Sequence, residues 1–398
     1  MMIIQHLNFS AWMPTQVVFG VNAVREQLPT EVLKTRCKKP IIVTDQGLVN
    51  SGIVGPILNN LTEHGIRPVI FAEVEPNPVA ATVQKGSELF SHEQCDLIIA
   101  IGGGSAMDVA KALAVAVTHP GDILDYRRGG KDIQGPVPSI FAIPTTAGTG
   151  SEVTTVAVIT DPVQKRKFVV SSPLLAPKIA FVDPVMTYSL PPHHVAATGM
   201  DALVHAIEAY TSNRAHPIGD SLALEAMRML REYLPVSYAD PTNHEAKAQV
   251  MLASTMAGFA FMHSGLSLVH SMSHPMSAWF HVPHGLANAI LLPYVIEFNL
   301  IAQVEKYRRI HSIFNESSYR FTKYEAAKKL IEELRSFSQS LDIPNDFGYL
   351  QHDIDDQVLS GLAEDAMDDR TVRNNPRKPT KEDILALYKK VFPQYQKR

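Results

Sequence analysis

The alternation of short strand patterns with helical patterns in residues 1–185 most constrains the fold of this 398-residue chain. Runs rich in β-branched and other apolar residues, such as Pro40–Val43 and Asp96–Ile101, are separated by segments with apolar residues at helical spacing, such as Ala81–Glu93. Strands that alternate with helices of about 10–15 residues are typical of βαβ units and a mostly parallel sheet. The first part of the chain is therefore expected to form an α/β domain.

The pattern changes after the Pro-rich sequence Ser189–Pro192. Beyond it, apolar residues recur at helical spacing, as in His194–Thr211 and Glu245–His263, and strand patterns nearly vanish. Such Pro-rich punctuation is typical of a domain boundary. We predict an α/β domain over residues 1–185 and an all-helical domain over residues 186–398.

Composition excludes several classes of function. Lys and Arg number 36 against 40 Asp and Glu, so the net charge is −4, and no long basic run offers a nucleic-acid footprint. We find no stretch of about 18 uncharged apolar residues that could span a membrane, and the N-terminal sequence lacks the pattern of a secretory signal. Only Cys37 and Cys95 are present, which favours a reducing, cytoplasmic location.

A run of glycines lies where a predicted strand, Asp96–Ile101, passes into a predicted helix, Ser105–Thr118. Glycine lets the backbone approach a ligand closely, and the N-terminus of a helix binds anions such as a pyrophosphate. The Rossmann pattern G-x-G-x-x-G is not met, because Met107 stands at its third glycine. A tight turn without a ligand is the alternative. The run consists of Gly102, Gly103 and Gly104, followed by Ser105.

Two further features favour a nucleotide cleft. Asp45 directly follows the strand Ile41–Thr44, where an acid can accept hydrogen bonds from a ribose and repel a 2′-phosphate. It can equally cap the next helix. Ile143–Glu152 is a loop rich in hydroxyls and glycines, suited to phosphate or amide groups, although a polar turn explains it equally well. Together these features predict a nucleotide site at the carboxyl ends of parallel strands.

Histidines are concentrated in the helical part: ten of the sixteen lie between His193 and His284. Asp201 and His205 stand at i and i+4, so they share a helix face, and His270 and His274 repeat that spacing. Imidazoles together with a carboxylate suit a divalent first-row metal, iron or zinc. The alternative is that each is a packed or surface residue. Glu208 could orient His205 or form a surface ion pair.

The motifs taken together resemble the iron-containing (group III) alcohol dehydrogenases, which include lactaldehyde:propanediol oxidoreductase, 1,3-propanediol dehydrogenase and butanol dehydrogenases. Order, spacing and residue type agree from about Phe19 to Arg377. One departure is Ser267, where the family usually has a glycine. The matching motifs are Gly102–Ser105 with Asp108 and Lys111, Pro144–Glu152, Gly199–Glu208, His270-x3-His274 and Pro283–Gly285.

The resemblance implies a Rossmann-like dinucleotide-binding domain followed by a helical metal-binding and catalytic domain, an architecture shared with dehydroquinate synthases. It also implies that His274 lies beside the metal, near the nicotinamide, without ligating it. The implied metal ligands are Asp201, His205, His270 and His284. The implied cofactor-binding residues are Asp45, Asn77, Gly102, Gly103, Gly104, Ser105, Asp108, Thr145, Thr146, Thr149 and Lys167.

We therefore expect an NAD-dependent alcohol dehydrogenase that interconverts short-chain primary alcohols or diols and their aldehydes. The metal, expected to be Fe²⁺ with Zn²⁺ as the alternative, would act as a Lewis acid, and His274 would relay the proton. The rival functions are a metal-dependent lyase of the dehydroquinate synthase type and a nucleotide-binding regulatory protein. We expect neither nucleic-acid nor membrane partners. We expect a homodimer or a higher homo-oligomer, and the predicted edge strand Thr15–Phe19 could pair across a dimer.

Overall fold

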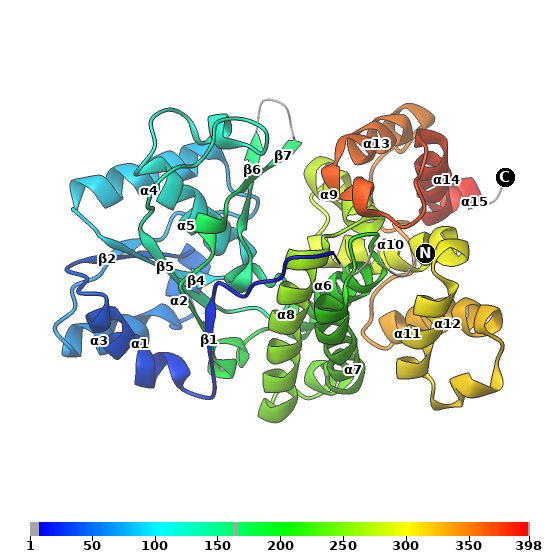
Figure 1. The fold of residues 1–398 in the computed structure, drawn as a ribbon, viewed down its shortest axis with the longest axis horizontal. Coiled ribbons are helices and arrows are strands. Elements are labelled where there is room, and N and C mark those ends of the chain that lie inside the picture. The colour runs from blue at the N-terminus through cyan, green and yellow to red at the C-terminus, as the bar shows by residue number, and fades with distance from the viewer. Residues whose placement is uncertain (1–7, 162–165, 397–398) are drawn as a thin grey trace. The chain divides into compact units, whose positions relative to one another are not determined.

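The computed structural model describes residues 8–161 and 166–396, and they form two compact units (Figure 1). The α/β unit runs from Trp12 to Ser189. The helical unit combines the described residues up to Ala11 with those from Leu190 onward. An α/β unit with a parallel sheet and a unit whose described elements are helices confirm the fold class predicted from the sequence.

The α/β unit is built on a six-stranded sheet in which every neighbouring pair of strands is parallel. Its central strands are buried on both faces, which explains why they are continuous apolar runs in the sequence. In spatial order the strands are β1 (Gln16–Phe19), β8 (Ile179–Val182), β5 (Ser139–Pro144), β4 (Leu97–Gly102), β2 (Pro40–Val43) and β3 (Val69–Phe71).

Helices α1 and α3 pack together against strand residues such as Ile99 and Phe141, through Leu28 and Leu61. Successive strand residues point to opposite faces, so the intervening residues are left for other helices. Helices α4 and α5 pack together, and α5 also contacts β4 and β5. The helices of this unit are α1 (Ala23–Lys34), α2 (Gln46–Asn50), α3 (Val54–Glu63), α4 (Ala80–His92) and α5 (Gly104–Ala116).

A separate antiparallel pair, β6 (Val156–Asp161) and β7 (Arg166–Ser171), packs beside α5. Lys111 of α5 anchors the segment that leads into this pair. Its side chain is fully buried, and Nζ donates to the carbonyl oxygens of Ser151 and Val156 at 2.7 and 2.9 Å. The hydroxyls of Ser151 and Thr154 lie 3.0 Å from the same nitrogen. Burial lowers the pKa of Lys111, while Asp108 and Glu152 oppose that shift.

The helical unit contains the candidate metal ligands. Two of its later helices begin with a capping box, Thr322 with Glu325 and Thr380 with Asp383, which satisfies their first N–H groups. Its helices are α6 (Pro192–Thr211), α7 (Pro217–Ala239), α8 (His244–Ser264), α9 (Leu268–Phe280), α10 (His284–Asn299), α11 (Val304–Phe314), α12 (Lys323–Gln339), α13 (Asp356–Asp368), α14 (Lys381–Val391) and α15 (Pro393–Gln396).

One segment, His284–Ala302, is long and apolar enough to cross a membrane by length and composition, with a mean hydropathy of 1.5. Helices α8 and α9 taken together are also long and apolar enough, but they meet at a 108° bend. Of the apolar window in His284–Ala302, 61% is buried inside the protein, where α10 packs against α6, α9 and α12. Its apolar character therefore matches the core helix of a helical domain.

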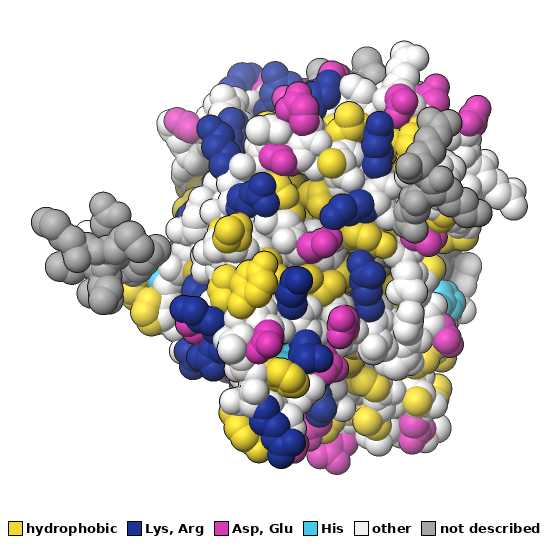
Figure 2. All heavy atoms as spheres, turned by 90° about the vertical axis from the view of Figure 1, so that its right-hand side faces the viewer, with side chains coloured by type: hydrophobic (Ala, Val, Ile, Leu, Met, Phe, Trp, Pro, Cys, Tyr) yellow, Lys and Arg dark blue, Asp and Glu magenta, His cyan; other side chains and the backbone are white. Residues whose placement is uncertain are grey.

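The face of the molecule drawn in Figure 2 carries basic and acidic side chains interspersed among apolar ones. Several charged side chains of the described residues are paired, such as Lys323 with Glu305 and Lys390 with Glu297. Mixed signs of this kind fit the near balance of charge in the sequence.

Removal of the Lys111 amine tests its anchoring role. In Lys111→Met, the carbonyls of Ser151 and Val156 and two hydroxyls lose their donor, and Asp108 loses its buried counter-charge. We expect the free energy of unfolding to fall by about 3–5 kcal/mol in urea titrations. The exposed Lys85, paired with Glu73, provides the control. Lys85→Met should change the free energy of unfolding by less than about 0.5 kcal/mol. Equal effects of the two substitutions would contradict the anchor.

Candidate metal centre and nucleotide-binding loop

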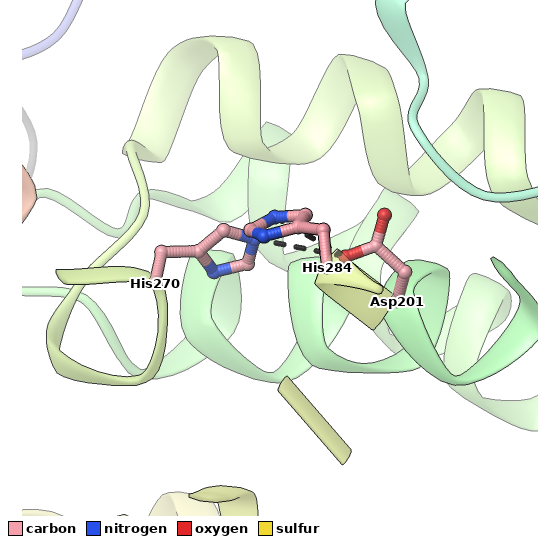
Figure 3. A group of neighbouring side chains, drawn as sticks. All are labelled: Asp201, His270 and His284. Carbon is pink, nitrogen blue, oxygen red and sulfur yellow. Dashed lines mark ion pairs between the residues drawn. The ribbon is translucent and has the colours of Figure 1, made fainter. Parts of the chain in front are cut away.

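Three buried or half-buried side chains of the helical unit converge on one point (Figure 3). The ligand atoms of Asp201, His270 and His284 all lie within 4.8 Å of one another. Oδ1 of Asp201 is 3.8 Å from Nε2 of His270 and 3.8 Å from Nε2 of His284. His205 lies next to this group, with Nε2 at 3.7 Å from the same oxygen and its ring stacked on that of His270 at 4.7 Å. The structure thus brings the four predicted ligands together.

Local sequence explains this convergence. Asp201 and His205 lie one turn apart on α6, so both side chains leave the same face of the helix. Gly285, next to His284, lets the first turn of α10 approach α6 closely. A Cβ at Gly285 would lie 2.1 Å from the carbonyl oxygen of Ala197 and 3.1 Å from Cβ of Asp201. The glycine therefore sets how near His284 comes to Asp201.

Glu208, two turns after Asp201 on α6, fixes the start of α9. The carboxylate is buried and accepts hydrogen bonds from the backbone N–H of Ser267 at 2.9 Å and of Val269 at 2.7 Å. It also accepts from the hydroxyl of Ser267 at 2.8 Å and from Nδ1 of His270 at 2.7 Å. Glu208 therefore orients His270, whereas the sequence had suggested His205 or a surface ion pair. Ser267, which stands where the family usually has a glycine, thus has Glu208 as its hydrogen-bond partner.

The bond to Glu208 decides which nitrogen of His270 is available. Since Nδ1–H donates to the carboxylate, the lone pair of the neutral ring is on Nε2, which faces Asp201. Burial would raise the pKa of Glu208, but the His270 ring and the hydrogen bonds from Ser267 outweigh burial and lower it. Glu208 thus remains a carboxylate, as the partners of metal-binding histidines commonly are.

His274 is held by a carboxylate from a distant part of the chain. Its Nδ1 donates to Oδ2 of Asp369 at 2.6 Å, and its ring stacks on that of His284 at 5.3 Å. It is not part of the converging group of ligand atoms. Burial tends to raise the pKa of Asp369, but His274 and hydrogen bonds from Thr371 lower it to about 2.

The glycine run of the α/β unit packs under the hydroxyl-rich loop. A Cβ at Gly102 would lie 2.6 Å from that of Ala106, so only glycine fits this turn. Sites for a Cβ on Gly103 and Gly104 lie 3.3 Å from Oγ1 of Thr146 and 3.1 Å from Cγ2 of Thr149. In addition, the N–H of Thr145 donates to the Gly102 carbonyl at 3.0 Å.

In the described part of the chain, the first turn of α5 begins without a side-chain cap. Its N-cap is Gly103, and among the described residues no side chain caps its free N–H groups, which include that of Ser105. These groups and the threonine hydroxyls lie where the sequence predicts phosphate binding.

The position of Asp45 is compatible with both roles considered from the sequence, a helix cap and an acceptor for a ribose. Its Oδ1 accepts from the N–H of Leu48 at 2.9 Å and caps α2. Its Oδ2 lies 4.0 Å from where a Cβ of Gly102 would be, so the carboxylate also borders the glycine run.

The remaining predicted cofactor residues lie beside the pair β6–β7. Asp108 is half-buried, accepts from the Ser151 hydroxyl at 3.2 Å and faces Lys111, so its described contacts support the loop. Lys167 of β7 stands opposite Thr160 of β6 in the strand register. The N–H of Thr160 donates to the Pro78 carbonyl at 2.7 Å. Asn77, the residue before Pro78, has a left-handed backbone conformation with φ at +55°.

Family models match nearly the whole chain. The model for iron-containing alcohol dehydrogenases matches residues 14–184, and the model for the C-terminal part of the Fe-containing alcohol dehydrogenase family matches residues 195–392. The chain belongs to the iron-containing alcohol dehydrogenase family. This confirms the resemblance predicted from its motifs and the predicted class of enzyme, an NAD-linked alcohol dehydrogenase.

Several relatives of this iron-containing alcohol dehydrogenase match over their full length. It is 37% identical to the NAD-dependent methanol dehydrogenase of Bacillus methanolicus, covering 95% of this chain and 98% of the relative. It is 38% identical to the 1,3-propanediol dehydrogenase of Klebsiella pneumoniae, covering 96% and 99%. The solved alcohol dehydrogenase from Oenococcus oeni superposes with a TM-score of 0.93 at 34% identity, covering 96% and 100%.

Two residues beside the candidate ligands, Asp369 and Asn288, were not predicted from the sequence. Asp369 lies 95 residues after His274, and no spacing rule joins them. Asn288 is one turn after His284 on α10, so its helical spacing was a usable signal, but its amide side chain did not resemble a metal ligand. Its contacts are described below.

The depressed pKa of Asp369 predicts a pH-dependent stability. Because this pKa is about 2 in the folded alcohol dehydrogenase, below the ordinary 3.8, ionised Asp369 stabilises the fold above about pH 4, and the contribution is lost toward pH 2. We expect Asp369→Asn to lower the free energy of unfolding by about 2 kcal/mol at pH 7. The difference in the free energy of unfolding between this variant and the unaltered protein should become smaller as the pH falls to 3. Urea titrations at both pH values measure it, with the exposed Asp353→Asn as control. A gap independent of pH would contradict this account.

Proposed function

We propose that this enzyme interconverts short-chain primary alcohols or diols and their aldehydes, with NAD as the hydride carrier and one divalent metal ion. The observation that carries the proposal is the buried convergence of Asp201, His270 and His284, with His205 beside them. One carboxylate and three imidazoles form a compact donor set that fits a divalent first-row metal.

Iron is the ion we propose, supported by the family to which the chain belongs. The same donors suit zinc, so metal analysis of the purified protein distinguishes the two. When bound, the metal supplies Lewis acidity toward the substrate oxygen, and NAD accepts the hydride from the carbinol carbon.

The protein residues supply orientation and proton transfer. Glu208 holds His270 with Nε2 toward Asp201. We assign to His274 the transfer of the hydroxyl proton toward solvent. Two observations support this role: the side chain is 20% exposed, and donation from Nδ1 to Asp369 leaves Nε2 of the neutral ring free to accept a proton.

For the cofactor we propose NAD, bound by the glycine run and its neighbours. The supporting observations are the uncapped first turn of α5, the threonines packed against the glycines, and the Asp45 carboxylate at their border. A carboxylate there favours a ribose hydroxyl and repels a 2′-phosphate. Asn77 and Lys167 are proposed to contact the cofactor from the β6–β7 side. Asp108 keeps its proposed place in this set, although its described contacts are with the loop.

We also propose a cytoplasmic homodimer. Both cysteines are free thiols, which suits a reducing compartment. Strand β1 is at the edge of the sheet and pairs on one side with β8, so its other side can pair with a second copy. Light scattering of the purified protein measures the assembly.

The function is tested with a panel of alcohols and diols on protein of measured metal content. Protein reconstituted with Fe²⁺ or Zn²⁺ should reduce NAD with short primary alcohols or diols, and the apoprotein should not. Failure of every substrate with fully loaded protein would contradict the proposal.

Substitutions of the ligands separate metal binding from proton transfer. His270→Ala and His284→Ala should lose both the metal and the activity, because each removes one of four ligands. His274→Ala is the matched variant, since its ring stacks on His284. It should keep the metal and lose about 10²–10⁴-fold in kcat. Metal retained in His284→Ala, or lost in His274→Ala, would overturn the proposed ligand set.

Cofactor preference depends on the charge of Asp45. Asp45→Asn keeps an oxygen that can cap α2 but removes the charge, whereas Asp45→Gly removes both. We expect both variants to raise kcat/KM for NADP relative to NAD by at least about tenfold. The measurement is the ratio of kcat/KM for the two cofactors in the three proteins. If Asp45 only caps the helix, the Asn variant will keep the original ratio.

A further inference from the structure

Asn288 extends its amide group toward the side chains of the candidate metal centre. It lies one turn after His284 on α10 and is fully buried. Its Nδ2 is 2.7 Å from Oδ1 of Asp201 and 3.2 Å from Nε2 of both His270 and His284. These are the ligand atoms that converge in the candidate metal centre.

The distances indicate which of these contacts holds Asp201. At 3.7–3.8 Å, the imidazole nitrogens are too far from Oδ1 for hydrogen bonds, whereas Asn288 at 2.7 Å is well within range. A buried carboxylate without a donor is costly. Asn288 therefore supplies the hydrogen bond that keeps this carboxylate in place.

The orientation of the amide follows from the groups it faces. Toward the Asp201 carboxylate and the lone pair on Nε2 of His270, an NH₂ group is attracted and a carbonyl oxygen is repelled. Oδ1 accordingly points away, and it is buried without a hydrogen-bond partner among the described residues. The side chain thus leaves one acceptor unsatisfied in order to direct its donors at the ligands.

The amide has two hydrogens and three of the candidate ligand atoms within reach, so it can bridge them but cannot bond fully to all three. Once the two imidazole lone pairs bind a cation, they no longer accept from Asn288. The bond to Asp201 can persist, because Oδ1 has a second lone pair.

We propose that Asn288 is a positioning residue of the metal centre, which bridges Asp201, His270 and His284 in the metal-free protein and retains its bond to Asp201 when the ion binds. This inference rests on the ligand set of the proposed function. It assigns to Asn288 the role of pre-arranging the ligands, which raises the affinity for the ion without contacting it.

Asn288→Leu keeps a side chain of similar size and removes the donor. The affinity for Co²⁺, measured by competition with a chelator, should fall by about 10–100-fold, as is typical when a partner of a metal ligand is removed. The visible absorption bands of bound Co²⁺ should keep their positions, because the set of ligands is unchanged.

Asn299→Leu is the matched control. Asn299 is a buried asparagine on the same helix, and its amide exchanges hydrogen bonds with that of Asn375 rather than with the ligands. It should lower the stability of the fold while leaving the affinity for Co²⁺ within about twofold of the original.

Two outcomes overturn the inference. An undiminished affinity for Co²⁺ in Asn288→Leu would show that the bridge contributes nothing. Bands shifted to those of a lower coordination number would make Asn288 a ligand instead. If His284→Ala still binds Co²⁺, the proposed ligand set fails; if only Asn288→Leu binds it normally, the failure is confined to the present inference.

Discussion

The buried carboxylate of Glu208 holds the candidate metal centre in its arrangement. A charge in the interior must be matched by donors, and Glu208 finds them at the start of α9, in two backbone N–H groups, one hydroxyl and one imidazole. The N–H groups at a helix start would otherwise lack partners. A single side chain thereby satisfies α9, ties it to α6 and presents His270 to Asp201.

In the α/β unit, a buried side chain of the opposite charge likewise bonds to backbone groups of a neighbouring segment. Lys111 is buried in α5 and donates to the loop that leads into β6, so the loop keeps one conformation above the glycine run. In each unit, the polar groups nearest that unit's own candidate residues are held by a buried charged side chain from a helix, Glu208 of α6 or Lys111 of α5. Long loops without such anchors are usually mobile.

Sequence reasoning reached the fold class because local periodicity reports which face of an element is buried. The same periodicity paired Asp201 with His205, and spacing together with the family resemblance named His270 and His284. It could not identify the partner of Glu208, since i+3 and i+4 relations describe one helix, whereas His270 comes from another. The contact of His274 with Asp369 depends likewise on how separate helices pack, which no single segment encodes.

The absence of a side chain at Gly285 makes the candidate metal centre sensitive to a substitution that changes none of the proposed ligands. A single methyl group there would meet the backbone of α6 at Ala197 and act as a wedge between the two helices. The helices would have to separate, and His284 would move away from Asp201 with its imidazole chemically intact. The substitutions that this enzyme can accept are therefore limited by the narrow space between α6 and α10, as well as by the identity of the proposed ligands.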